Sequence, residues 1–393
     1  MKHLITVIRI VVALVFIASG LVKANDPLGL SYKMQEFFEV WGFTTLHFTT
    51  LPAAVIMNVF EIVTGVALLV GWRPKEVTRM LLVLILFFTF LTGYAYLSGK
   101  FKSCGCFGDC LPISPFQSFL KDLVLLGLII ALMRWHQHIK QSVPSTIGGI
   151  ILIVATGASS YMQVYVLNNL PFVDCLPYKV GNNLVEKMQM PVGATLDSFA
   201  ITFRYKKAGQ IVEFDGNSIP ADLDSTYEFV DRYDKLVKKG ADAKPPISDL
   251  VFLNANRKDT TIDILNQPGY YVLLWVKNPQ NIDRNLATQI KELKKLAANK
   301  FIPVFIVTGI SDMQYWSPLG FNENEVLLCD YTVSKTAARV DPMYMLMQQA
   351  NVLDKHPVEQ TNSFFQEVQQ LKSNPEPYKF VPSDQPIPKL KAD

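Results

Sequence analysis

Apolar residues in the first part of the chain form five long runs, at residues 4–22, 51–71, 79–98, 118–134 and 145–167. Each run approaches the roughly 20 residues that a helix needs to cross the hydrocarbon core of a bilayer. A cleaved signal peptide is an alternative for the first run, but Arg9 interrupts this run and the run is long. The pattern therefore predicts an α-helical membrane bundle of four helices in residues 1–140 and a fifth transmembrane helix in residues 141–171.

The pattern changes after the fifth run, where shorter segments with strand-like alternation begin. These segments predict a small β-rich connector over residues 172–248. Buried strands then alternate with amphipathic helices, which predicts an α/β domain over residues 249–373. The final residues, 374–393, contain five prolines and predict an extended tail. The segments that carry these predictions are strands at 201–205, 211–214, 270–276 and 302–308, and helices at 286–299 and 361–372.

The charges separate the two parts of the chain further. Residues 1–171 carry 12 Lys and Arg with 7 Asp and Glu, whereas residues 172–393 carry 25 and 27. The whole chain is 50% apolar and only 18% charged, and this composition together with the split excludes a single soluble enzyme. Its formal net charge of +3 divides into +5 for the first part and −2 for the second. This balance leaves no concentrated basic surface, so nucleic acid is not expected as a partner.

Basic residues at the ends of the apolar runs predict the orientation of the chain in the membrane. They gather at the turns after the second and the fourth run: Arg73, Lys75, Arg79, Arg134 and Lys140. Because such residues are enriched on the cytoplasmic side, both turns and the N-terminus are expected in the cytoplasm. The 99–117 loop and everything after residue 168 then lie outside, which in a bacterial inner membrane means the periplasm.

The order of elements after residue 249 resembles a thioredoxin-like domain. That family carries its redox pair, Cys-x-x-Cys, at the turn after the first buried strand. Here the turn reads Lys277-Asn278-Pro279-Gln280, so no thiol can attack from this position. Asp341-Pro342 stands where the fold usually keeps a cis proline, although a plain strand start is the alternative. The resemblance implies a docking surface that has lost its thiols.

Three of the five cysteines, Cys104, Cys106 and Cys110, lie within seven residues in the loop after the third run. Thiols in an oxidising compartment either pair structurally or take part in exchange. Cys175 follows the fifth run closely and should reach the same membrane surface, so we predict a disulfide between Cys110 and Cys175. Cys329 ends an apolar run and is expected to be a buried structural residue.

Two interpretations remain for Cys104 and Cys106. A bond between them closes a very small, strained ring, and strain makes a disulfide a good oxidant. Alternatively, both stay reduced or only stabilise the turn. A metal site is a third option, but the cluster has no neighbouring His and lacks the paired Cys-x-x-Cys of zinc sites, so no metal is predicted.

Glu61 lies in the middle of the second apolar run, where an unpaired charge is costly and usually faces the bundle interior. A functional intramembrane carboxylate is one interpretation. The other is structural, with pairing to Arg9, or with protonation and a hydrogen bond to Asn58 or Thr64.

Lys121 and Asp122 open the fourth run near the cysteine loop. A snorkelling lysine and an aspartate at a helix N-terminus are ordinary features there. A nearby lysine also lowers the pKa of a thiol, whereas the anionic Asp109 raises it, so the loop could be electrostatically poised.

The membrane part also resembles a known family. The first run and its end look like the DoxX superfamily through Arg9, Ser19, Gly20, Leu21, Lys23, Asp26 and Pro27. The sequence Cys104-Gly105-Cys106-Phe107-Gly108 and the Lys121-Asp122 pair are similar to its MauE-like branch, named for a methylamine utilisation protein. The resemblance covers residues 4–134 and implies a four-helix bundle, broadly like those of DsbB and vitamin K epoxide reductase.

The resemblance implies periplasmic thiol redox chemistry, and quinone as a cofactor follows from that analogy only. The fifth run and the thioredoxin-like domain depart from the MauE-like pattern and look like an arrangement from the Bacteroidetes. The leading hypothesis is therefore an inner-membrane thiol–disulfide redox protein with Cys104 and Cys106 as its exchanging pair. The alternative is a non-enzymatic assembly or scaffold factor that binds a periplasmic or envelope protein.

Overall fold

The computed structural model of the protein describes residues 2–101, 105, 108, 110–111, 113–191, 198–207, 210–215, 226–238 and 245–377. Five helices in these residues are long and apolar enough to cross a membrane, which confirms the five predicted spans. They are α1 (Lys2–Asn25), α3 (Thr50–Val70), α4 (Pro74–Ser98), α5 (Pro115–Arg134) and α6 (Ser145–Asn168). The chain is thus a multi-pass membrane protein whose apolar outer surface requires a lipid bilayer.

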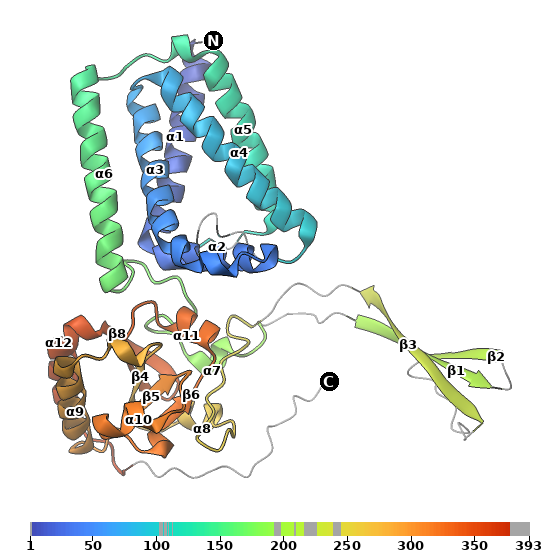
Figure 1. Ribbon diagram of the computed structural model, residues 1–393, viewed down its shortest axis with the longest axis vertical. Helices are drawn as coiled ribbons and strands as arrows, with labels where there is room; N and C mark the ends of the chain where they lie inside the picture. The colour runs from blue at the N-terminus through green and yellow to red at the C-terminus, as the bar shows by residue number, and fades with distance from the viewer. Residues whose placement is uncertain are drawn as a thin grey trace.

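Helices α1, α3, α4 and α5 form one bundle, with α6 beside α3 at its edge (Figure 1). Helices α1 and α3 pack closely against each other, because glycines at their contact have no side chain to keep the backbones apart. A Cβ atom added to Gly65 would lie 2.8 Å from Cγ1 of Ile17 and 3.1 Å from the carbonyl oxygen of Ala13. Small residues at such a crossing let the two backbones approach and gain van der Waals contact.

Helix α2 (Pro27–Trp41) was not predicted from the apolar pattern, because its sequence is too polar for a span. It begins with Asp26, whose side chain accepts a hydrogen bond from the Gly29 amide at 3.0 Å, and Pro27 occupies the first turn. Phe37 stacks on Phe101, which covers one side of the helix. Figure 1 shows α2 lying across the end of the bundle where α1 ends and α5 begins, which we call the domain-facing end.

A mixed α/β domain lies next to this end (Figure 1). Its five-stranded sheet has the order β6-β5-β4-β7-β8, in which β4, β5 and β6 are parallel, β7 is antiparallel to β4, and β8 is antiparallel to β7. The strands are β4 (Tyr270–Trp275), β5 (Val304–Thr308), β6 (Val326–Leu328), β7 (Met343–Gln348) and β8 (Asn351–Pro357). The helices of this part are α7 (Leu184–Lys187), α8 (Thr261–Leu265), α9 (Arg284–Ala298), α10 (Met313–Trp316), α11 (Tyr331–Ala337) and α12 (Thr361–Gln370). Short 3-10 turns occur at η1 (Thr44–Thr49), η2 (His136–His138), η3 (Pro279–Asn281), η4 (Ser317–Leu319), η5 (Glu323–Glu325) and η6 (Val358–Gln360).

Strand β4 is buried on both faces and separates two hydrophobic cores. Its residues alternate between the cores, because successive side chains of a strand point to opposite faces. One core packs α9 and α12 against the sheet. The other contains Tyr178 and Leu184, which lie in the expected connector of residues 172–248. Residues on both sides of the boundary expected at residue 249 therefore share one core. The local strand pattern could not show this, because it carries no information on long-range packing.

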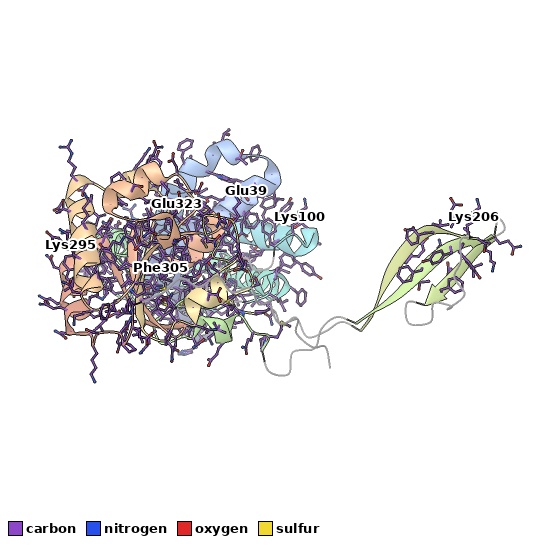
Figure 2. All side chains as sticks on the ribbon, turned by 90° about the horizontal axis from the view of Figure 1, so that it is seen from below. Glu39, Lys100, Lys206, Lys295, Phe305 and Glu323 are labelled. Carbon is purple, nitrogen blue, oxygen red and sulfur yellow. A yellow bond between two sulfur atoms is a disulfide. The ribbon has the colours of Figure 1, made fainter. Side chains whose placement is uncertain are left out.

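The remaining part of the expected connector forms a separate antiparallel sheet of β1 (Ser198–Lys207), β2 (Gln210–Asp215) and β3 (Tyr227–Lys238). Its order is β2-β1-β3, and the predicted strands at 201–205 and 211–214 lie within β1 and β2. Figure 2 shows this sheet, with Lys206, standing away from the rest of the protein.

The glycine contact between α1 and α3 yields a stability prediction. Gly65→Val should force the two helices apart and lower the free energy of unfolding by about 1–3 kcal/mol. Thermal unfolding of the purified protein in detergent measures this loss. Gly127→Val is the matched control, since a Cβ atom on Gly127 meets nothing within 4 Å. Equal melting temperatures for the two variants would contradict the close packing.

Candidate functional site

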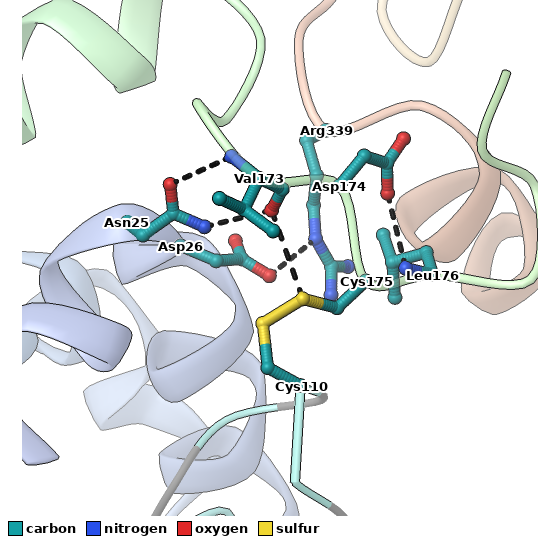
Figure 3. Close-up of a disulfide and its surroundings, with 8 residues drawn as sticks. All are labelled: Asn25, Asp26, Cys110, Val173, Asp174, Cys175, Leu176 and Arg339. Carbon is teal, nitrogen blue, oxygen red and sulfur yellow. Dashed lines mark hydrogen bonds and ion pairs between the residues drawn. A yellow bond between two sulfur atoms is a disulfide. The ribbon is translucent and has the colours of Figure 1, made fainter.

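A disulfide joins Cys110, in the loop between α4 and α5, to Cys175, in the segment after α6 (Figure 3). The two Cα atoms lie 4.8 Å apart, and this is the pair expected from their common place beside the membrane. Cys329 is buried in the core of the α/β domain, and burial raises the pKa of its thiol to about 12. At neutral pH this thiol is therefore protonated and unreactive.

Cys104, Cys106 and Asp109 lie outside the described residues. Two glycines of the same loop show where the loop runs. A Cβ atom on Gly105 would lie 3.0 Å from Cγ of Lys33 in α2, and one on Gly108 would lie 3.6 Å from Cγ1 of Val22 in α1. Gly105 and Gly108 thus lie against α2 and α1, respectively, at the domain-facing end.

Polar contacts dock the α/β domain on this end of the bundle. Arg339, which is only 5% exposed, donates from Nε to a carboxylate oxygen of Asp26 at 2.9 Å. Asp26 therefore both caps α2 and binds the α/β domain. Asn25 exchanges two hydrogen bonds with the backbone of Val173, at 2.8 and 3.1 Å, beside the disulfide (Figure 3). These contacts hold the segment that carries Cys175 against α1.

Two lysines strengthen the docking from the side of the α/β domain. Lys335 of α11 donates to the Gln35 side chain at 3.1 Å, and its ammonium group lies 4.8 Å from the ring centre of Tyr32. Lys355 of β8 is almost fully buried and pairs with Asp174, next to Cys175, at 2.8 Å. Apart from Asp26, none of these docking residues stood out in the sequence, because each docks through a partner more than 100 residues away along the chain.

The turn after β4 carries a lysine in place of the thiols that the thioredoxin resemblance would require. The Lys277 amide donates to Asp341 at 2.7 Å, and its ammonium group donates to the carbonyl of Ala338 at 2.8 Å and to that of Arg339 at 3.3 Å. The peptide bond between Asp341 and Pro342 is cis. Lys277 thus fixes the backbone of Arg339, which binds the bundle.

Inside the bundle, Glu61 pairs with Lys23 and not with Arg9. Arg9 lies near the other end of α1, about 21 Å away by helical rise, where its guanidinium donates to the carbonyl of Lys140 at 2.7 Å. Pairing with Arg9, one alternative left open for Glu61, is therefore wrong. For the other alternative, a hydrogen bond to Asn58 or Thr64, the structure shows Thr64 donating to backbone carbonyls and Asn58 donating to Gln163 at 3.0 Å.

A second ion pair lies close to the first. Nζ of Lys121 lies 3.0 Å from Oδ1 of Asp122. The side chain of Asp122 is 1% exposed and accepts a hydrogen bond from the Thr92 hydroxyl at 3.0 Å. Asp122 is therefore a buried residue rather than a solvated helix start. Lys23, Glu61, Lys121 and Asp122, which we call the buried quartet, line one cavity of about 10 Å³.

One further cluster lies on β8 and α12, where His356 sits between Asp354 at 3.2 Å and Glu367 at 3.0 Å. The hydrogen bond to Asp354 raises the pKa of His356. Its three ligand atoms are close enough for a metal ion, since all lie within 4.8 Å of one another. The raised pKa fits a second arrangement equally well, in which a protonated imidazole forms ion pairs with both carboxylates. The geometry alone therefore assigns the cluster no metal.

Loss of the disulfide should lower the stability of the folded protein. Cys175→Ser removes a crosslink between residues 65 positions apart, and we expect the free energy of unfolding to fall by about 2–4 kcal/mol. Thermal unfolding and limited proteolysis of the 170–191 segment measure the effect. Reduction of the wild-type protein should reproduce it, and an unchanged melting temperature in both cases would refute a stabilising role.

Lys277 should make stability depend on pH. Burial lowers the pKa of Lys277 from 10.5 to about 8 in the folded protein. Between pH 8 and 10.5 the unfolded chain therefore binds more protons at this residue, and the Lys277 contribution to the free energy of unfolding rises with pH. In denaturant unfolding, the free energy of unfolding of the wild-type protein should increase relative to that of Lys277→Met between pH 8 and 10.5. The exposed Lys295→Met serves as control, and a flat difference for Lys277→Met would contradict the prediction.

Comparison with known proteins identifies the membrane part. Residues 1–135 match the family model of the methylamine utilisation protein MauE, and residues 199–239, in the separate sheet, match a domain of unknown function (DUF8463). Protein TlpB of Flavobacterium psychrophilum is 28% identical over 131 residues, which are 32% of this chain and 35% of that protein. The chain thus spans about a third of the length of this curated relative. No solved structure matches the chain. The protein therefore has an N-terminal membrane region of the MauE family, followed by an α/β domain.

Proposed function

We propose that the protein is a thiol–disulfide redox protein of a bacterial inner membrane, with Cys104 and Cys106 as its exchanging pair. The observation that carries this proposal is the fate of the other three cysteines. Cys110 and Cys175 are bonded to each other, and Cys329 is buried in a core. Exchange is thereby left to Cys104 and Cys106.

In the proposed orientation, the domain-facing end and the α/β domain lie in the periplasm. The basic residues at the opposite end of the bundle support this orientation, since they flank the turns between α3 and α4 and between α5 and α6. An oxidising periplasm is also compatible with a structural disulfide beside the membrane.

The α/β domain is proposed to be thioredoxin-like and to act by docking a protein partner. Support comes from the sheet order, in which the parallel strands β6, β5 and β4 continue into β7 and β8 through two antiparallel pairs. Lys277 replaces the thiols at the turn after β4. The domain would then position a periplasmic client over the cysteine loop without reacting itself.

The proposed reaction conserves atoms and electrons. A thiolate of the client attacks the Cys104–Cys106 disulfide, and a second client thiolate then resolves the mixed disulfide. The client gains a disulfide, and Cys104 and Cys106 become thiols. A membrane quinone then accepts two electrons and two protons from these thiols, which restores their disulfide and yields quinol.

A non-enzymatic assembly factor is the second candidate function. The thiol-free turn at Lys277 supports it, as do the docking contacts of Arg339 with the bundle. In that case the bundle anchors the α/β domain, and an envelope protein binds the domain.

Single cysteine variants distinguish the two functions. Cys104→Ser or Cys106→Ser in the full-length protein should abolish reduction of a short-chain ubiquinone analogue by a dithiol substrate, because a disulfide needs both partners. Cys329→Ser is the control and should keep the rate. Full complementation of a deletion strain by both loop variants would exclude the redox function and leave the assembly factor.

A further inference from the structure

We propose that the buried quartet of Lys23, Glu61, Lys121 and Asp122 is a proton-binding site that passes protons between the domain-facing end and the interior of the bundle. The site is defined by the contacts of four helices. Lys23 comes from α1, Glu61 from α3, and Lys121 and Asp122 from α5, while Thr92 of α4 donates to Asp122.

Burial makes this cluster unusual for a membrane bundle. The side chains of Lys23, Glu61 and Asp122 are 1–3% exposed, whereas Lys121 is 26% exposed. Two ammonium groups and two carboxylates give the quartet no net charge, which lowers the free-energy cost of burying it inside the bundle. Ionisable residues inside a membrane are rare and generally mark ion or proton pathways.

The cavity between the two ion pairs fits one water molecule. Its volume of about 10 Å³ is close to the minimum for a single water, and the quartet supplies more than the two to four polar partners that such a water requires. The same volume is far too small for a quinone ring. A proton carried by water and side chains is therefore the ligand that the cavity can accommodate.

Helix packing alone does not require these charges. The Gly20 and Gly65 contacts already bring α1 and α3 together. A buried ion pair is often no more stabilising than apolar side chains of similar volume. A purely structural role would thus be served equally well by apolar residues, which favours a role in which the charges themselves are used.

Helix α1, which carries Lys23 of the quartet, also lies close to Gly108 of the cysteine loop. Val22, which precedes Lys23, faces Gly108 of that loop. Formation of one disulfide from two thiols releases two protons, and reduction of a quinone consumes two. A carboxylate of the quartet that takes up one such proton and later releases it returns the quartet to its starting state. This use in redox chemistry rests on the proposed function, whereas proton binding by the quartet does not.

Infrared spectroscopy of the full-length protein in lipid nanodiscs tests proton binding without any redox partner. Acidification should produce a band of a buried protonated carboxyl, at higher frequency than that of solvated acids. Lys23→Met with Glu61→Gln removes one ion pair without leaving a lone buried charge, and should remove or shift this band. Lys294→Met with Glu325→Gln removes a pair in the α/β domain and should leave the band unchanged.

The second measurement is the rate at which the protein reduces the short-chain ubiquinone analogue. We expect the Lys23→Met, Glu61→Gln variant to be slower by about 100-fold, with an altered pH profile and solvent isotope effect. If that variant does not fold, Asp122→Asn is measured in its place, since an amide oxygen can still accept from Thr92.

The outcomes separate the two proposals. A wild-type protein without the buried carboxyl band overturns the proton site, whatever its redox activity. A folded variant that retains the band and the wild-type rate overturns the site as well. A wild-type protein that shows the band but never reduces the quinone refutes the proposed function and leaves the proton site standing.

Discussion

The bond between Cys110 and Cys175 is the interaction on which the arrangement of the protein depends. It joins the loop between α4 and α5 to the segment after α6, and so fixes the α/β domain to one end of the membrane bundle. The polar contacts beside it are few and specific. Asp26 binds Arg339, and Asn25 holds Val173. The chain already tethers the two parts through α6, and the disulfide adds a second link that keeps the docking surfaces close together, so that a small polar interface suffices.

The docking contacts connect the α/β domain to the bundle through one continuous set of residues. Lys277 holds the backbone of Ala338 and Arg339, and Arg339 binds Asp26, which also caps α2. The turn after β4 therefore supports the docking contact.

The bundle interior is organised by charge as well as by packing. Glycines bring α1 and α3 into contact, and the apolar core fills the space toward α4 and α5. Within that core two ion pairs face a cavity that fits one water. Their depth in the membrane and their closeness to the loop give the bundle a polar site of its own, separate from the disulfide.

The sequence alone determined the five spans, because twenty apolar residues have few other stable environments. It also determined the strands of the α/β domain and the pairing expected of Cys110 with Cys175, through alternation and position along the chain. Only the tertiary structure decided which charges meet. Arg9 and Lys23 lie on the same helix and are both cations, so the choice of Lys23 as the partner of Glu61 depends on how α1 and α3 are aligned. Helix α2 and the shared core of Tyr178 with β4 likewise depend on contacts between distant segments, which no local pattern encodes.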